Sequence, residues 1–195
     1  VTNNNLVLLN QIHSNRVKFV NKNTINRFVG DGLITNKKNL ALGILTADCA
    51  PIFIFDNKKK IVCCLHSGWR GALNNIVKES IKIIKKLKIE INDINAVIGP
   101  CLSVENFEVD KDFKLQFIKK NESYSNFFKS KNLNKDYFNL RKLINFQLQS
   151  ENINKIHNIG QDTYKNDHCF FSHRRATHMK KLPTGRMINI ISLKD

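Results

Sequence analysis

The chain has 195 residues, of which 42% are apolar and 25% are charged, and its formal net charge is +16. This length and composition favour a globular protein with a large core and exclude collagen-like, coiled-coil and disulfide-miniprotein classes, and no apolar run approaches the ~20 residues of a membrane-spanning helix. The five cysteines, an odd number, favour a reducing compartment and predict a cytoplasmic location.

The first hundred residues predict short strands separated by turns. Apolar residues dominate five stretches, at 6–9, 16–20, 40–45, 52–55 and 61–65. The last three are almost wholly apolar, as is typical of strands that are covered on both faces. Pro51 predicts a bend between two of them, and the adjacent Cys63 and Cys64 are predicted to be small core residues.

Helices are predicted mainly in the second half of the chain. Apolar residues recur at helical spacing over 73–87, with lysines on the opposite face. The pattern over 110–150 is mostly helical, with a polar stretch at 121–136 that is predicted to be a loop. The remaining predicted strands are 93–98, 155–159 and 187–193. Because no linker interrupts the pattern, residues 1–195 are predicted to form one domain.

The positive charge has two interpretations. A basic surface attracts phosphates, which suggests a nucleic-acid-binding protein. However, the chain is rich in Asn, Lys and Ile, with 27, 25 and 23 residues, and an A/T-rich coding sequence produces this mixture without selection for charge. The lysines are dispersed, whereas Arg70, Arg174, Arg175 and Arg186 stand in segments that look like sites. The arginines therefore point to a pocket for a small anion rather than to a polymer.

Three potential metal ligands stand at the ends of predicted strands. His13, Cys49 and His66 are separated by long intervals, but strand ends are where distant side chains converge on a rigid scaffold. Two imidazoles and one thiolate suit Zn²⁺, and a catalytic zinc site has three protein ligands with one open position. The spacing leaves two alternatives open: core or backbone-bonded residues, and a thiolate–imidazole nucleophile pair.

Two arginine-containing segments are candidate anion sites. Gly68, Trp69, Arg70 and Gly71 connect a strand to a helix, where glycines allow close approach of a ligand and the helix start favours negative charge. The alternative is a tight turn with a packed tryptophan. Later in the chain, three arginines form a second basic cluster that suits phosphate or is simply a solvated charged surface: Arg174, Arg175 and Arg186.

Together, these segments resemble one family, the laccase-like multicopper polyphenol oxidoreductases or YfiH-like proteins, also described as purine nucleoside phosphorylases. The matching runs are Gln11–Ser14, Asp31–Thr35, Thr46–Pro51, His66–Gly71, Ile98–Cys101, Phe170–Arg175 and Thr184–Arg186. They occur in family order and cover nearly the whole chain. Members usually carry a further N-terminal segment, which we expect this chain to lack, in agreement with a start at Val1 rather than Met.

The resemblance implies a fold and a metal. The fold is of the α+β class, a single-domain layered α/β/β/α sandwich related to the deamidase domain of a bacterial cytotoxin. The metal is zinc, with copper as the alternative, held by His13, Cys49 and His66. The sequence departs from the family pattern at Asp162, where members often have a cysteine. Any role of the family's cysteine is therefore in doubt for this chain, whereas the three ligand positions are intact.

The implied activity is phosphorolysis of adenosine, inosine and methylthioadenosine, with adenosine deamination as a second reaction. Asp48, Cys49 and Arg70 are the predicted catalytic residues; Asp48 is a candidate proton carrier or partner of the adjacent ligand, or else a turn carboxylate. The residues predicted to bind nucleoside or phosphate are Gln11, Gly68, Trp69, Arg70, Gly71, Arg174, Arg175 and Arg186. The expected partners are these small molecules, with no membrane or specific nucleic acid, and a homodimer remains open.

Three other functions compete with nucleoside chemistry. A His₂Cys set also forms the core of a blue-copper centre, but six histidines are too few to add the His-rich cluster of a multicopper laccase. A hydrolase or deamidase that uses Cys49 as its nucleophile is the second alternative. The third alternative is a nucleic-acid-binding protein, but the sequence contains no recognisable nucleic-acid-binding motif.

Overall fold

A six-stranded sheet forms the centre of the molecule in the computed structural model, which describes residues 5–22, 27–58 and 60–194. Its strand order is β13-β9-β7-β8-β5-β3. The bounds are β3 Val17–Phe19, β5 Gly32–Thr35, β7 Ala50–Asp56, β8 Val62–Ser67, β9 Ile94–Ile98 and β13 Lys155–Asn158. The four inner strands are paired antiparallel, and the two outer strands are parallel to their neighbours.

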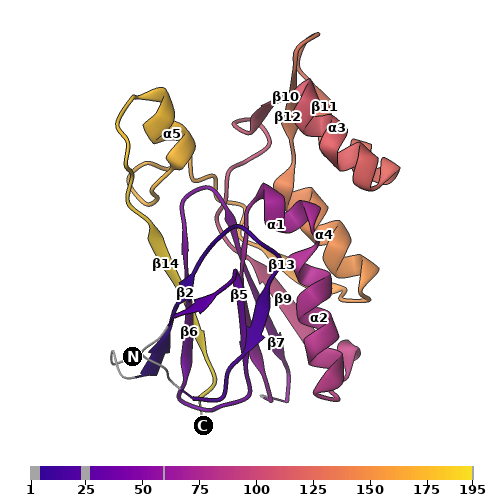
Figure 1. The fold of residues 1–195 in the computed structure, drawn as a ribbon, viewed down its shortest axis with the longest axis vertical. Coiled ribbons are helices and arrows are strands. Elements are labelled where there is room, and N and C mark those ends of the chain that lie inside the picture. The colour runs from indigo at the N-terminus through magenta and orange to yellow at the C-terminus, as the bar shows by residue number, and fades with distance from the viewer. Residues whose placement is uncertain (1–4, 23–26, 59, 195) are drawn as a thin grey trace.

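Helices cover one face of this sheet (Figure 1). They are α1 (Trp69–Leu73), α2 (Ile76–Lys86) and α4 (Leu140–Ser150). The single helix predicted over 73–87 is wrong in one respect, because the structure has two helices with a break before Ile76. Asn75 adopts a left-handed conformation with φ 55°, and its side chain accepts a hydrogen bond from the Lys78 N–H. An asparagine in this role ends one helix and caps the next.

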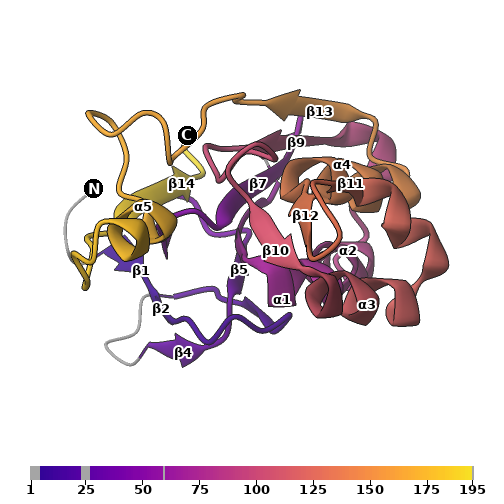
Figure 2. The ribbon, with the colours of Figure 1, turned by 90° about the horizontal axis from the view of Figure 1, so that it is seen from above.

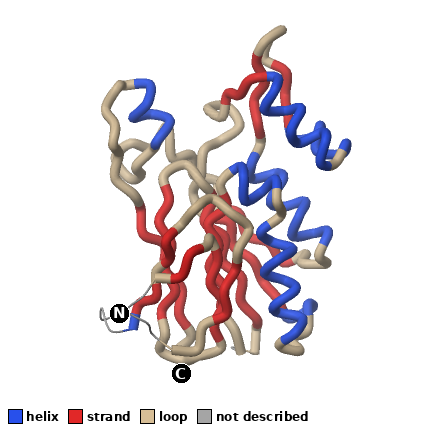
Figure 3. Tube along the Cα trace, in the orientation of Figure 1, coloured by secondary structure: helices blue, strands red, loops and turns tan. Residues whose placement is uncertain are grey.

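A second sheet packs on the opposite face, so that two sheets and a helical layer succeed one another (Figures 1 and 3). It contains β1 (Leu6–Val7), β6 (Ala41–Thr46) and β14 (Met187–Ser192) in the order β1-β6-β14. Cys63 faces the core beneath the helices, and Cys64 faces the core between the sheets. Both are fully buried, as predicted, and the predicted layered fold of mixed helices and strands is confirmed.

The region predicted as a loop over 121–136 contains strands instead. A separate three-stranded sheet, antiparallel throughout, has the order β10-β12-β11. The elements here are β10 Glu108–Asp110, α3 Lys111–Lys120, the 3₁₀ helix η3 Glu122–Phe127, β11 Phe128–Ser130 and β12 Lys135–Phe138. Phe117, Phe128 and Phe138 pack together with centroids 4.9–5.5 Å apart. Asp136 is buried against Lys111 at 2.8 Å. Aromatic packing therefore supports strands in a stretch whose composition is polar.

Pro51 lies inside β7 rather than at a bend. Residues 47–49 make the turn between β6 and β7, and Asp48 adopts φ 81° there. Pro51 pairs with His66 across the β7–β8 ladder, while the β7–β9 ladder begins only at Ile52. The missing N–H of Pro51 therefore falls beyond the end of β9, which is how proline is accommodated in an inner strand.

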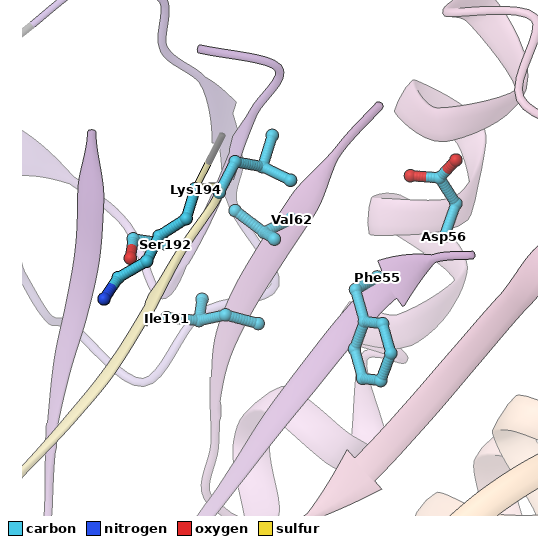
Figure 4. Close-up of a pocket in the computed structure, with 7 residues that line it drawn as sticks. Phe55, Asp56, Val62, Ile191, Ser192 and Lys194 are labelled. Carbon is cyan, nitrogen blue, oxygen red and sulfur yellow. The ribbon is translucent and has the colours of Figure 1, made fainter. Parts of the chain in front are cut away.

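The two ends of the sheets differ in what surrounds them. At one end stand α5 (His173–His178) and the β10–α3 region, on either side of the strand ends (Figures 1 and 2). The remaining short elements are β2 Leu9–Asn10, β4 Phe28–Val29 and the 3₁₀ helix η2 Ile91–Asp93. At the other end, a cavity of about 330 Å³ lies between β7, β8 and β14, lined mainly by apolar side chains such as Phe55 and Ile191 (Figure 4). Among the described residues, no helix combines the length and apolarity that spanning a bilayer requires.

Candidate metal and substrate site

Three side chains from separate turns and strands meet at the α5 end of the sheets. His13 lies in the turn after β2, Cys49 in the turn between β6 and β7, and His66 near the end of β8. One ligand atom from each lies within 4.8 Å of the others. The two imidazole rings are 4.8 Å apart and nearly perpendicular. The predicted convergence of these three residues at strand ends is therefore what the structure shows.

A buried carboxylate that the sequence analysis did not single out orients this cluster. Asp31, which is fully buried, lies directly before β5 and accepts a hydrogen bond from His66 Nδ1 at 2.8 Å. Since Nδ1 is engaged, Nε2 is the ring nitrogen of His66 that remains for the cluster. Asp31 was present in one of the matching runs, Asp31–Thr35, and this was the signal that the sequence offered.

Gly68 provides the space that Cys49 occupies. A Cβ at this position would lie 2.8 Å from Cys49 Sγ and 3.1 Å from His13 Cδ2. Real carbon–sulfur contacts are longer than this, so any side chain would displace the ligands. The residue has φ −78° and ψ 179°, which any amino acid can adopt. Glycine is required here by the closeness of the thiol rather than by its backbone conformation.

Without a metal, the electrostatics of the cluster favour a Cys49 thiolate beside a protonated His66, and a metal bound there would displace the proton from His66. Burial opposes ionisation of Cys49, but hydrogen bonds from His13 and His66 outweigh it and lower the pKa of the thiol to about 7. Burial disfavours the charged form of His66, yet its hydrogen bonds to Asp31 and Cys49 raise its pKa to about 9. By contrast, burial raises the pKa of Cys64 well above its usual value. Cys49 is thus the cysteine of this cluster whose thiolate form suits a borderline-soft metal.

A cavity of about 910 Å³ opens beside the cluster. Gln11 and Arg27 line it on the side of β2 and β4, Trp69 and Arg70 at the start of α1, and Phe107 before β10. Residues of the chain's C-terminal part complete the lining: His173, Arg174 and Arg186. The cavity therefore combines the candidate ligands with several guanidinium groups and an aromatic wall. Arg27 and His173 were not predicted as site residues: no motif surrounds Arg27, and His173 lies in the matching run Phe170–Arg175 but was not singled out there.

Two of the predicted arginines are held in place against aromatic rings. The guanidinium of Arg70 lies 4.5 Å from the Trp69 ring centroid, and that of Arg174 lies 5.6 Å from the Phe107 ring centroid. Arg174 Nη1 also donates to the Glu108 carbonyl at 2.9 Å. Stacking on an aromatic face fixes the planar guanidinium while leaving donors for an anion. These two arginines present preorganised positive charge to the cavity.

Asp48 connects the cluster to α5. Its Oδ1 accepts from Thr163 Oγ1 at 2.6 Å, and its Oδ2 accepts from the Arg174 N–H at 2.6 Å. The carboxylate adjoins Cys49 in the same turn, where φ of Asp48 is 81°. Because both oxygens already accept hydrogen bonds, the geometry favours the second of its predicted roles, a partner that orients its neighbours, over that of a proton carrier.

Other predicted residues lie near the cavity with their polar groups engaged elsewhere. The Gln11 amide donates to the Leu45 carbonyl and accepts from the Leu45 N–H, at 2.8 and 2.7 Å. Arg186 donates to the carbonyls of its own turn. Arg175 and Gly71 are absent from the cavity lining. The Arg175 guanidinium donates to three backbone carbonyls, which gives it a structural role and argues against the predicted contact with phosphate.

The departure at Asp162 is also explained by local hydrogen bonds. Its carboxylate accepts from Ser103 N and Oγ, Asn106 Nδ2 and Tyr164 N, at 2.6–3.2 Å. It therefore joins two loops and belongs to the framework of the fold. The four histidines outside the cluster are exposed, and none joins a second group of ligands in the part of the chain that the structure describes.

Comparison with known proteins agrees with this architecture. Residues 1–194 match a family model described as multi-copper polyphenol oxidoreductase laccase. Among curated relatives, a purine nucleoside phosphorylase of Rickettsia prowazekii is 32% identical, covering 97% of this chain and 78% of the relative. A purine nucleoside phosphorylase of Campylobacter jejuni is 33% identical over 97% of this chain and 77% of the relative.

Solved structures show the same fold. A Neisseria meningitidis protein superimposes with a TM-score of 0.87 at 26% identity, covering 97% of this chain and 75% of that one. A Bacillus licheniformis protein called YfiH gives a TM-score of 0.88 at 25% identity, covering 98% and 75%. With the family model matching nearly every residue, the chain belongs to the laccase-like multi-copper polyphenol oxidoreductase family.

Proposed function

We propose that this chain is a zinc-dependent purine nucleoside phosphorylase that acts on adenosine, inosine and methylthioadenosine. One observation carries the proposal: a single cavity joins the His13–Cys49–His66 cluster to Arg70 and Arg174. Phosphorolysis needs both an anion site and a means of stabilising charge on the leaving base. Two relatives at 32% and 33% identity bear the name purine nucleoside phosphorylase, which supports the same reaction.

The donor set fits a zinc ion. Imidazole nitrogens and a thiolate are the ligands that zinc prefers, and three protein ligands with a fourth position open are typical of catalytic sites. A zinc ion held by His13, Cys49 and His66 would supply Lewis-acid polarisation of a substrate oxygen or nitrogen. Asp31, bonded to His66 Nδ1, is the kind of outer partner that such sites require.

The chain's own residues account for the rest of the reaction. In phosphorolysis, a phosphate oxygen forms a bond to the anomeric carbon, the glycosidic bond breaks, and its electron pair leaves with the base. Arg70 and Arg174 bind and orient the phosphate, which reduces its repulsion from the departing electrons. The apolar side chains of Leu102, Phe107 and Val109 line the same cavity and limit water, which favours phosphate over water as nucleophile.

Adenosine deamination is the proposed second activity. In that reaction, water adds to the purine carbon that bears the amino group, and ammonia leaves. It needs the same recognition of the nucleoside in the cavity and no phosphate, so the two reactions are separable by omitting phosphate. The cytoplasmic location and the homodimer also remain predictions, and size-exclusion chromatography with light scattering tests the latter.

A cysteine hydrolase is the second candidate function. It is favoured by one specific observation, the lowering of the Cys49 pKa to about 7 beside two histidines, because a thiolate is the reactive form. The two functions differ in their response to metal. A hydrolase would keep its activity after chelation and form a covalent adduct at Cys49, whereas the proposed phosphorylase would lose activity on chelation and regain it with zinc.

Kinetics with inosine test the proposed role of the arginines. Arg174→Ala should raise the KM for phosphate by about 10- to 150-fold, because a charge-assisted hydrogen bond contributes ~1.5–3 kcal/mol. The matched control is Arg16→Ala, which removes an exposed guanidinium outside the cavity lining and should leave KM unchanged. An unchanged phosphate KM in Arg174→Ala, or full activity after removal of all metal, would contradict the proposal.

A further inference from the structure

We propose that Asp31 is a positioning residue that builds the metal site by fixing two of its three ligands, His13 and His66, with one buried carboxylate. The proposal rests on the proposed function only for the identity of what the cluster binds. Asp31 itself is not among the residues that line the cavity. Its contacts nevertheless hold both imidazoles in the arrangement that a metal needs.

The first part of the evidence is the turn that carries His13. Asp31 Oδ1 accepts from the His13 N–H at 3.0 Å, and Oδ2 accepts from Ser14 N at 2.6 Å and Ser14 Oγ at 2.7 Å. His13 has φ 57°, a left-handed conformation that a non-glycine residue adopts at an energetic cost. Hydrogen bonds to a buried carboxylate on successive backbone amides offset that cost and keep the imidazole directed at the cluster.

The second part is the double attachment to His66. The Asp31 side chain accepts from His66 Nδ1 at 2.8 Å, and its backbone carbonyl accepts from the His66 N–H at 2.7 Å. The β5–β8 ladder, in which Gly32 pairs with Leu65, places the two residues opposite each other at the end of both strands. His66 is therefore held by both its backbone and its ring.

The chemistry of the carboxylate explains why aspartate is needed. An ionised carboxylate only accepts hydrogen bonds, so Nδ1 of His66 must keep its proton and Nε2 presents its lone pair to the cluster. Asparagine has one accepting oxygen and one donating NH₂ group. With its oxygen toward Ser14, the NH₂ faces His66 Nδ1 and selects the opposite tautomer, whose Nε2 is protonated. In the other orientation, the NH₂ group of the asparagine faces the Ser14 backbone N–H, and two donors then face each other without an acceptor.

Asp31→Asn, with Asp56→Asn as the matched control, tests the proposal. Asp56 is also buried and also accepts two backbone N–H groups, from Lys60 and Ile61 at 2.7 and 2.8 Å, but at the other end of β7. Competition with a chromophoric chelator gives the zinc affinity. We expect Asp31→Asn to bind zinc about 10- to 100-fold more weakly and Asp56→Asn to bind like the unmodified chain. Cobalt-substituted Asp31→Asn should also show an altered ligand-field spectrum.

A metal-free measurement separates this proposal from the proposed function. Nitrogen-15 NMR of the histidine side chains should show a protonated, hydrogen-bonded Nδ1 at His66 in the unmodified chain and in Asp56→Asn, and its loss in Asp31→Asn. If the unmodified chain has this signal but binds no zinc, the metal function fails and the positioning role stands. Equal zinc affinity, an equal cobalt spectrum and the same His66 signal in Asp31→Asn would overturn the positioning role.

A milder variant covers the case in which Asp31→Asn does not fold. Ser14→Ala removes the hydroxyl that donates to Asp31 Oδ2 and accepts from the Arg16 N–H at 3.2 Å. It leaves the contacts of the carboxylate with the His13 and Ser14 backbone amides in place. It should weaken zinc binding by about 2- to 10-fold, the loss expected when the carboxylate loses one hydrogen bond. Zinc affinity equal to that of the unmodified chain would contradict the proposed role of the carboxylate in fixing this turn.

Discussion

Gly68→Ala is the substitution that most sharply probes the packing of the proposed metal site. The added Cβ would stand 2.8 Å from Cys49 Sγ and 3.1 Å from His13 Cδ2. Ordinary contacts are ~3.5–4.0 Å, so the sulfur or the backbone must move by about 0.7–1.2 Å. Zinc–ligand distances tolerate only ~0.2 Å. The displacement is several times that tolerance.

The expected cost follows from this overlap. Overpacking a filled site costs ~1–3 kcal/mol, and 1.4 kcal/mol corresponds to a factor of ten in affinity. If the strain falls on the ligands, zinc binding should weaken roughly 5- to 140-fold. The backbone at Gly68 has φ −78° and ψ 179°, which alanine adopts without strain. The loss therefore reports contact with the ligands and not a change in the turn.

Chelator competition and thermal unfolding, measured on the same samples, give the assay. Gly160→Ala is the matched control, because nothing lies within 4 Å of a Cβ placed there; its zinc affinity should equal that of the unmodified chain. Metal-free Gly68→Ala should unfold at a temperature no more than a few degrees lower. If Gly68→Ala binds zinc as tightly as Gly160→Ala, the thiol does not hold the position described and the reasoning fails.

Three other predictions concern the thiol, the cavity and the core. In metal-free protein, alkylation of Cys49 measured by mass spectrometry should rise with pH through a midpoint near 7, because His13 and His66 lower the pKa of the thiol to about 7 and the thiolate dominates above it. A midpoint of 9 or higher would contradict the effect of the histidines, since burial by itself raises the pKa of this thiol. The single tryptophan, Trp69, lines the cavity, so inosine should change its fluorescence, and a flat titration at concentrations that support turnover would place the nucleoside elsewhere. Ile81→Ala removes a fully buried side chain of α2 and should lower the free energy of unfolding, measured by urea titration, by ~2–5 kcal/mol. Zinc affinity should not change. A loss of unfolding free energy below about 1 kcal/mol would contradict the packing described for this side chain.

The three cluster residues could be predicted because each has a recognisable signal in its own sequence segment. His13, Cys49 and His66 each follow or end an apolar stretch, and the ends of buried strands converge in space. Asp31 was not predictable in the same way. Its role depends on the pairing of Gly32 with Leu65, which places Asp31 opposite His66. Local periodicity does not predict which distant strands pair or in which register.

Two other differences have physical causes that sequence patterns do not contain. Residues 121–136 look like a polar loop, yet they contain a 3₁₀ helix, the strand β11 and the start of the strand β12. Pairing of β11 with β12 and packing of Phe128 on Phe138, with ring centroids 4.9 Å apart, stabilise the two strands. Arg175 looks like a phosphate ligand, but the path of the preceding loop brings three carbonyls to its guanidinium. In both cases, tertiary contacts override the local composition.

Phosphorus NMR of a single reaction tests the central claim most directly. Zinc-loaded protein is incubated with inosine and inorganic phosphate, and the ribose product is identified. The account predicts a ribose 1-phosphate signal that grows in step with free hypoxanthine and is absent for Cys49→Ser. Release of hypoxanthine at the same rate without phosphate, with free ribose as the product, would contradict it.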